Sequence, residues 1–95
     1  MAILSFDDER LVAIHNQRHP GKGFPPDLIR VVQRKLRYLD AATNLDDLRA
    51  PPGNRLHALK DDRAGQHAIS VNDLFRICFA WTPAGPTELE FTDYH

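Results

Sequence analysis

The sequence predicts an α+β domain, in which two N-terminal helices pack on one face of a mostly antiparallel sheet of four to five strands. Two observations favour this fold class. Apolar residues recur at spacings of three and four in the first half of the chain, whereas apolar and polar residues alternate after Gly53. The length of 95 residues is typical of one domain, so we expect a single domain over residues 1–95.

The chain is predicted to begin with a short strand at residues 2–6, an apolar run. Ser5 followed by Asp8 predicts a capped helix from about residue 8 to residue 18, because the serine oxygen can accept an unpaired backbone N–H. Pro20 cannot donate to the helical ladder, so the helix is expected to stop at residues 19–21.

A second helix is predicted from Pro25-Pro26-Asp27 to about Ala42, since proline is tolerated in the first turn. Its apolar positions are typical of an amphipathic helix, namely Leu28, Val31, Val32, Leu36 and Leu39. Asn44 is expected to cap a short turn over residues 45–49. Pro51-Pro52-Gly53 then predicts a break in the chain.

Four further strands are expected, at residues 55–59, 66–71, 75–81 and 88–93, with a two-residue turn at Asn72-Asp73. The third of them alternates most clearly. Its apolar face carries Phe75, Ile77, Phe79 and Trp81, and its other face carries Arg76, Cys78 and Ala80. Because both helices cover one face of the sheet, the opposite face is left partly open, and a functional site is expected there.

Composition excludes several classes of protein. Twelve Lys and Arg against thirteen Asp and Glu give a formal charge of −1, which excludes a polybasic nucleic-acid binder but allows a local basic patch. One cysteine excludes an intramolecular disulfide framework and a Cys-rich zinc site. No apolar run approaches the length of a membrane span, and no secretory signal is visible, so we expect a protein of the reducing cytoplasm, with no membrane partner.

The histidines differ in what their neighbours imply. His15 and His19 have the spacing of zinc ligands on one helix face, but Pro20 interrupts the helix and no third ligand follows, so no metal site is expected. His67 is expected to be structural or at the rim of the sheet. His57 is a half-exposed strand histidine that could be structural or catalytic.

Arg76 lies in the most hydrophobic strand, where an arginine is costly unless it is paired. Two interpretations stay open: an ion pair with Asp93 or Glu90, or a phosphate anchor on the open face. Cys78 is expected to be a small buried side chain. The closing Asp93-Tyr94-His95 continues directly from a strand and offers three groups suited to proton transfer or orientation.

Residues 28–39 contain four basic residues and no acid. Arg30, Arg34 and Arg37 fall on one stripe of the predicted helix. Such a stripe is either a solvated helix face or a contact for an RNA backbone, which requires only local positive potential.

Several motifs together resemble the HigB branch of the RelE toxin superfamily. They include Pro52-Gly53-Asn54-Arg55-Leu56-His57-Ala58-Leu59-Lys60, then Asp62-Arg63-Ala64-Gly65-Gln66, Asn72-Asp73, Arg76-Ile77-Cys78-Phe79, Trp81 and Asp93-Tyr94-His95. The similarity covers nearly the whole chain. It implies a RelE-like fold, a bacterial toxin that cuts mRNA in the ribosomal A site, and a cognate helix-turn-helix antitoxin, HigA-like, through which alone operator DNA would be contacted.

The resemblance also implies site residues. The family's catalytic positions fall on His57, Lys60, Arg76, Asp93, Tyr94 and His95, and the expected RNA-binding set is Arg30, Arg34, Arg37, Arg55 and Arg63. A 2′-hydroxyl can attack the adjacent phosphodiester without metal or cofactor, given a base, an acid and cations. The sequence does not say which group is base and which is acid.

This chain departs from the family pattern in two ways. Many relatives have arginine where this chain has Ser70, and the chain is less basic than is usual for these toxins. Two classes of function therefore stay open: a ribosome-dependent endoribonuclease, and a non-enzymatic toxin that acts as corepressor with its antitoxin. The intact set of candidate catalytic residues favours the enzyme.

Overall fold

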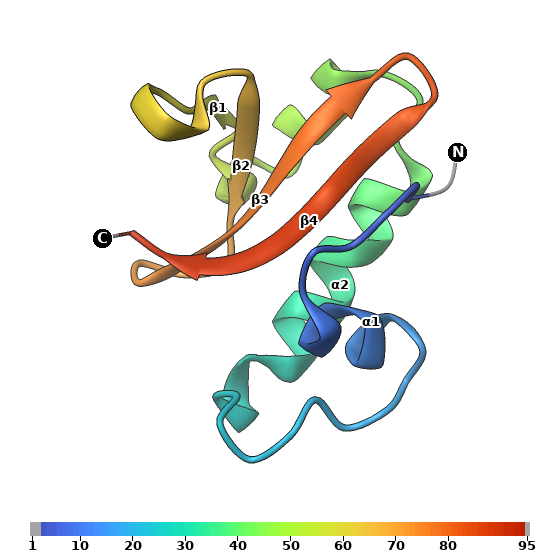
Figure 1. Cartoon of the computed structure of the whole chain (residues 1–95), viewed down its shortest axis with the longest axis vertical. Helices are drawn as coiled ribbons and strands as arrows, with labels where there is room; N and C mark the ends of the chain where they lie inside the picture. The colour runs from blue at the N-terminus through green and yellow to red at the C-terminus, as the bar shows by residue number, and fades with distance from the viewer. Residues whose placement is uncertain (1–2, 95) are drawn as a thin grey trace.

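The computed structural model describes residues 3–94 and has the predicted α+β architecture (Figure 1). Its helices and strands are α1 (Glu9–His15), α2 (Ile29–Ala41), β1 (His57–Ala58), β2 (Gln66–Ser70), β3 (Phe75–Thr82) and β4 (Gly85–Asp93). The strands form one sheet in the order β1-β2-β3-β4, and every pairing between them is antiparallel. Short 3-10 turns occur at Pro26–Leu28, Leu45–Arg49, Pro52–Asn54 and Asp61–Arg63.

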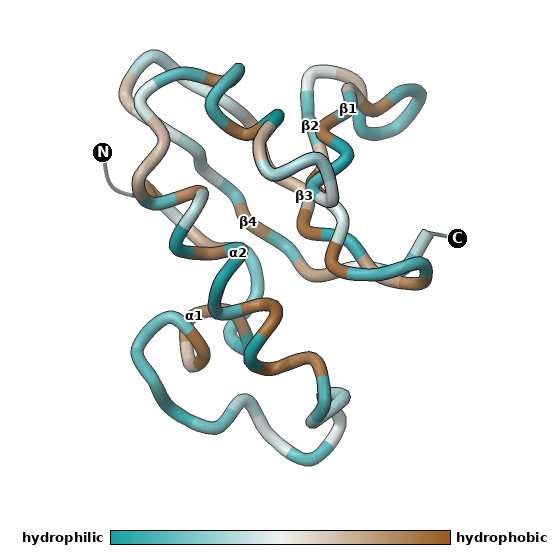
Figure 2. Tube along the Cα trace, turned by 180° about the vertical axis from the view of Figure 1, so that it is seen from behind, coloured by the Kyte–Doolittle hydropathy of each residue, from teal (hydrophilic) through white to brown (hydrophobic). Residues whose placement is uncertain are grey.

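The core lies between the two helices and one face of the sheet. The fully or nearly fully buried side chains there include Leu11 and Ile14 of α1, Val32, Leu36 and Leu39 of α2, and Ile77, Phe79, Leu89 and Phe91 of the sheet. Figure 2 shows hydrophobic and hydrophilic positions alternating along α2. Complete burial of one such side chain contributes about 1.5–3 kcal/mol, so the predicted apolar faces decide which side of the sheet the helices cover.

The N-terminal segment is not the predicted strand. Over its described residues it runs beside β4 but forms one isolated parallel bridge, between Phe6 and Leu89, so the sheet has four strands. The hydroxyl of Ser5 bonds to Thr87 and accepts the backbone N–H of Glu88. At that point β4 bulges, with Glu88 at a φ of 59° and a shift in register against β3. Ser5 therefore stabilises the bulge in β4. The prediction that Ser5 caps α1 is wrong.

Asp8 is the residue that caps α1, since its carboxylate accepts the backbone N–H of Arg10 at 3.0 Å. The helix ends at His15, three residues before the predicted end, because Gln17 adopts a left-handed φ of 62°. His15 and His19 therefore do not share a helix face. The ring of His15 packs against Phe6, and His19 accepts a hydrogen bond from the backbone of Gly21.

The second helix and the later strands follow the predictions with local differences. The turn at Pro26–Leu28 leads directly into α2, and Asn44 caps the following 3-10 turn as expected. Strand β1 is two residues long, against five predicted, because Arg55 has a φ of 48° and cannot continue an extended strand. The β2–β3 turn spans residues 71–74, and its Asn72 side chain accepts two backbone N–H groups. No helix within residues 3–94 is long and apolar enough to cross a membrane.

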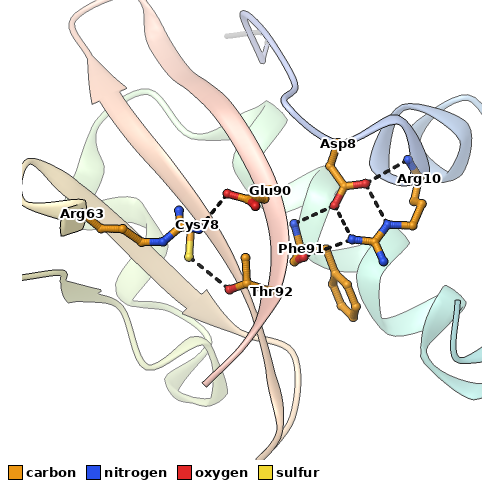
Figure 3. A network of polar contacts seen from close by, with 7 residues as sticks. All are labelled: Asp8, Arg10, Arg63, Cys78, Glu90, Phe91 and Thr92. Carbon is orange, nitrogen blue, oxygen red and sulfur yellow. Dashed lines mark hydrogen bonds and ion pairs between the residues drawn. The ribbon is translucent and has the colours of Figure 1, made fainter. Parts of the chain in front are cut away.

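Asp8 also ties α1 to β4. The Arg10 guanidinium donates to both of its carboxylate oxygens, at 2.9 and 2.7 Å, and the backbone N–H of Phe91 donates at 3.1 Å (Figure 3). Burial by itself would raise the pKa of Asp8, but the hydrogen bonds from Arg10 and Phe91 outweigh it, so the pKa lies below its usual value.

We therefore expect Asp8→Asn to lower the free energy of unfolding by about 1–3 kcal/mol at pH 7. A carboxyl whose pKa is lowered by folding stabilises the protein above its unfolded pKa of about 4, and this stabilisation is lost as the pH falls through the lower folded value. Urea unfolding at pH 7 and at pH 3 measures both effects. The difference between native and variant should shrink at pH 3, whereas the exposed Asp62→Asn should change little at either pH. An equal difference at both pH values would contradict the role of the ionised carboxylate.

Candidate functional site

The second face of the sheet carries polar groups over a floor of small side chains. The register places Ala68 and Ser70 of β2 and Arg76 and Cys78 of β3 on this face, followed by Glu90 and Thr92 of β4. Ala68, Ser70 and Cys78 are buried, as was predicted for Cys78. In Figure 3, Glu90 and Thr92 extend to one side of β4 and Phe91 to the other, toward α1. The polar face and the core face are therefore the two sides of one sheet.

Arg76 lies at the centre of a contact group near the end of β4. Its Nε donates to Thr92 at 3.4 Å, and its guanidinium carbon lies 5.1 Å from the centre of the Tyr94 ring. The Tyr94 hydroxyl bonds to Ser70, and its backbone N–H donates to Leu74 at 3.1 Å. These contacts hold Tyr94 on the polar face beside Arg76. The other guanidinium N–H groups of Arg76 can bind an anion.

Asp93 and Tyr94 lie on opposite sides of the sheet. Asp93 pairs with Phe75, which stacks on Phe91 in the core, so alternation places Asp93 on the side of the sheet opposite to Arg76. An ion pair between Asp93 and Arg76, one of the two interpretations above, does not fit this register. His95 lies outside the described residues.

His57 lies at the edge of the same polar face, because it pairs directly with Ala68 across β1 and β2. Its Nδ1 is 2.8 Å from the backbone carbonyl of Arg55. A carbonyl can only accept, so Nδ1 carries the proton in this bond, and Nε2 is left as the acceptor of the neutral ring. Lys60 follows two residues after β1 and is exposed.

Arg63 and Glu90 form the ion pair that crosses this face. Arg63 donates to Glu90 at 2.8 Å, beside Cys78 (Figure 3). It also donates to Gln66 at 3.0 Å. The hydrogen bond with Glu90 is the main cause that raises the pKa of Arg63. Glu90 is therefore the partner of Arg63, and the interpretation that pairs Glu90 with Arg76 is wrong. Arg55 is exposed and forms a 3.9 Å ion pair with Asp73, of the exposed kind that contributes little.

The predicted basic stripe is present on α2, where Arg30, Arg34 and Arg37 are all exposed. The buried side of α2 faces the sheet, so the stripe faces away from it and from the polar face. A hollow of about 300 Å³ opens beside the first turns of this helix, between Ile14 and Ile29, and includes none of the predicted site residues. The stripe and the candidate site are therefore separate surfaces.

The chain is similar to known toxins over most of its length. Residues 4–95 match the family described as "RelE-like toxin of type II toxin-antitoxin system HigB". The chain belongs to the HigB-like toxin family. Toxin HigB-1 of Vibrio cholerae is 36% identical over 78 residues, 82% of each chain. A protein of Proteus vulgaris named endoribonuclease HigB is 32% identical over 73 residues, 77% of this chain and 78% of that one. An uncharacterised protein of Haemophilus influenzae is 30% identical over 76 residues, 80% and 75% of the two chains.

Membership of a type II toxin-antitoxin family implies an antitoxin as partner of this HigB-like toxin. It also agrees with the resemblance stated from the sequence motifs. Two contacts on the polar face were not predicted, namely that of Thr92 with Arg76 and that of Glu90 with Arg63. Their positions depend on the β3–β4 register, which the bulge at Glu88 shifts by one residue. Ser70, noted in the sequence as a departure from the family, has a partner of its own in Tyr94.

The basic stripe of the toxin gives a test by charge reversal. If the three arginines contact ribosomal RNA, replacing all three by glutamate should weaken ribosome binding, and the slope of log K against log salt should become shallower by about 2–3 units. Folding should survive, because exposed substitutions usually cost little. Sedimentation with ribosomes at several salt concentrations measures the effect. Arg34→Glu should weaken binding more than Arg49→Glu, an exposed arginine outside the stripe. Unchanged binding would mean that the stripe is only a solvated helix face.

Proposed function

We propose that this toxin is an endoribonuclease that cuts mRNA in the A site of translating ribosomes and thereby inhibits translation. The observation that carries the proposal is that His57, Arg76 and Tyr94 occupy one face of the sheet, on three different strands or strand ends. A proton acceptor, a guanidinium and an aromatic ring on one face of a sheet suit a nucleotide with its phosphate. The name of the Proteus vulgaris relative supports the same activity.

The reaction requires neither metal nor cofactor. The 2′-hydroxyl oxygen of the target nucleotide attacks the adjacent phosphorus, the bond from phosphorus to the 5′ oxygen breaks, and the products are a 2′,3′-cyclic phosphate and a 5′-hydroxyl. One group takes the proton of the 2′-hydroxyl, and another gives a proton to the leaving 5′ oxygen. Negative charge builds on the phosphoryl oxygens during the attack and is stabilised by fixed cations.

His57 is suited to the role of base. Its proton is held at Nδ1 by the carbonyl of Arg55, so Nε2 is the lone pair available for the 2′-hydroxyl proton. Arg76 supplies forked donors for the phosphate, and the exposed Lys60 supplies a second positive charge. Tyr94 would stack on a base, which its position on the polar face beside Arg76 supports. His95 is the proposed acid, and Asp93 is the residue proposed to orient it.

The remaining RNA contacts and partners follow from the same proposal. Arg55 and Arg63 border the polar face and would meet the mRNA backbone, while the stripe on α2 would meet ribosomal RNA from the other side of the sheet. The partner that silences the toxin would be a HigA-like helix-turn-helix protein of the same bacterial cytoplasm. Operator DNA would be contacted through this antitoxin alone.

The ribosome should be required for efficient cutting. A site with so few cations on its face cannot hold a long RNA by itself, since affinity for RNA grows with the number of phosphates neutralised. We expect the purified toxin to leave naked mRNA almost intact and to cut the same mRNA on translating ribosomes. The cut products should carry 5′-hydroxyl ends. Cutting should persist when a metal chelator is added at a concentration that leaves the ribosomes intact. Primer extension locates the cuts. Efficient cutting of naked RNA would contradict the ribosome requirement. If the toxin cuts no RNA at all but represses the operator together with its antitoxin, the alternative function as a non-enzymatic corepressor would be favoured.

A further inference from the structure

A lysine is buried in α2 without a carboxylate partner among residues 3–94. Lys35 is 4% exposed, and its ammonium donates to the side-chain carbonyl oxygen of Asn54 at 2.6 Å. The ring of Tyr38 lies 5.9 Å from the same nitrogen. Burial lowers the pKa of Lys35, and the charge of Arg34 adds to this effect. A buried ammonium is costly, and a neutral amide offsets that cost less than a carboxylate would, so stability alone does not account for this lysine.

Asn54 connects this lysine to the segment that precedes β1. Asn54 is completely buried, and its amide nitrogen donates to the backbone carbonyls of Leu48 and Ala50 at 3.1 and 3.2 Å. Lysine can only donate and the two carbonyls can only accept, so these contacts allow one orientation of the amide. Removal of the ammonium would leave the buried amide oxygen unpaired. Lys35 therefore holds Asn54 in the orientation that closes the turn.

The turn held by Asn54 leads directly to the imidazole of His57. The backbone N–H of Asn54 donates to Pro51 at 2.9 Å, and that of Arg55 donates to Pro52 at 3.1 Å. Arg55 then takes a left-handed φ of 48°, a conformation that a residue other than glycine keeps only when its surroundings hold it. In that conformation the Arg55 carbonyl accepts the hydrogen bond from Nδ1 of His57. The orientation and the tautomer of the ring therefore depend on the turn.

We infer that Lys35 and Asn54 are positioning residues for His57: a buried ammonium in α2 fixes a buried amide, the amide fixes the Pro52–Asn54 turn, and the turn aims the carbonyl that keeps the His57 proton on Nδ1. This inference rests on the proposed function only for its effect on cleavage. The effect on the His57 ring is independent of it.

The test is the variant Lys35→Met, which keeps the length and bulk of the side chain and removes the donor. We expect 15N NMR of the histidine rings to show His57 with its proton on Nδ1 in the native toxin and a mixture of the two tautomers in the variant. On ribosomes, kcat for mRNA cleavage should fall by about 10- to 100-fold with little change in KM, because misaligning a catalytic group affects the chemical step. In a protein that already carries His57→Ala, adding Lys35→Met should cause no further fall in kcat for mRNA cleavage.

A control variant separates positioning from general destabilisation. Ile14→Val weakens the core at α1, remote in the chain from the turn, and should leave the His57 signals and kcat unchanged. If Lys35→Met does not fold, Asn54→Asp gives the same test, because it keeps an acceptor for the lysine and removes the donors to Leu48 and Ala50. Unaltered ring signals of His57 in folded Lys35→Met would overturn the inference. A further loss of cleavage when Lys35→Met is added to His57→Ala would overturn it too. If the native toxin cuts no mRNA, the proposed function fails, and the ring signals still decide the positioning role.

Discussion

Arg76→Gln is expected to slow cleavage of mRNA on the ribosome by about 100- to 1,000-fold, the cost of losing one fixed donor to charge that develops in a transition state. Arg76 is the arginine at the centre of the polar face, held by Thr92 and by the ring of Tyr94. Glutamine keeps a polar side chain of similar reach but lacks the positive charge and the forked donors. The free energy of unfolding should change by about 1 kcal/mol or less, because the contacts of Arg76 are partly exposed.

The matched control for this variant is Arg37→Gln, the same substitution at an exposed position of α2. Single-turnover cleavage on purified ribosome complexes compares the two, and binding to ribosomes is measured for both. We expect Arg37→Gln to cut at nearly the native rate once ribosomes are saturating. Equal losses in the two variants would reassign Arg76 from the chemical step to general electrostatic attraction.

Removal of Tyr94 and His95 is expected to lower cleavage by at least about 100-fold, the low end of the range for an acid–base group. Growth inhibition in a host without antitoxin should be relieved, and antitoxin binding should largely persist.

The sequence pattern predicted almost no cost in stability for this truncation, because Leu89 and Phe91 carry the buried face of β4. The structure corrects that expectation, since Tyr94 bonds to the buried Ser70 and covers Arg76. A loss of about 1–3 kcal/mol in the free energy of unfolding is expected for leaving Ser70 unpaired.

Two narrower variants separate the functions that the truncation removes together. Tyr94→Phe keeps the ring beside Arg76 and loses only the hydroxyl, so a small effect on cleavage would show that Tyr94 acts by stacking. Deletion of His95 alone tests the proposed acid and leaves the described contacts of Tyr94 in place. Full activity in both variants, with the proteins folded and bound to ribosomes, would restrict the chemistry to His57, Lys60 and Arg76.

The face of the sheet that carries Arg76 was predicted correctly, but the partners of its side chains were not. Alternation along β3 placed Arg76 and Cys78 on the face opposite to the core, and the structure confirms both positions. One of the two interpretations of Arg76 paired it with Asp93 or Glu90, but Glu90 pairs with Arg63 and Arg76 bonds to Thr92. Such pairings depend on the register between strands, and the bulge at Glu88 shifts that register. The periodicity of side chains along one strand carries no information about its register against the next strand.

The class of fold and the approximate positions of α2, β2, β3 and β4 follow from the sequence, because helical and strand periodicities depend on near neighbours along the chain. The tertiary structure determines which distant groups meet. Asp8 bonds to Phe91, Ser70 to Tyr94, and Lys35 to Asn54, and each of these contacts joins different elements. It also decided the left-handed turn at Arg55, which shortens β1 and orients His57. Buried polar groups must find partners once packing has removed water, and packing brings those partners from distant parts of the chain.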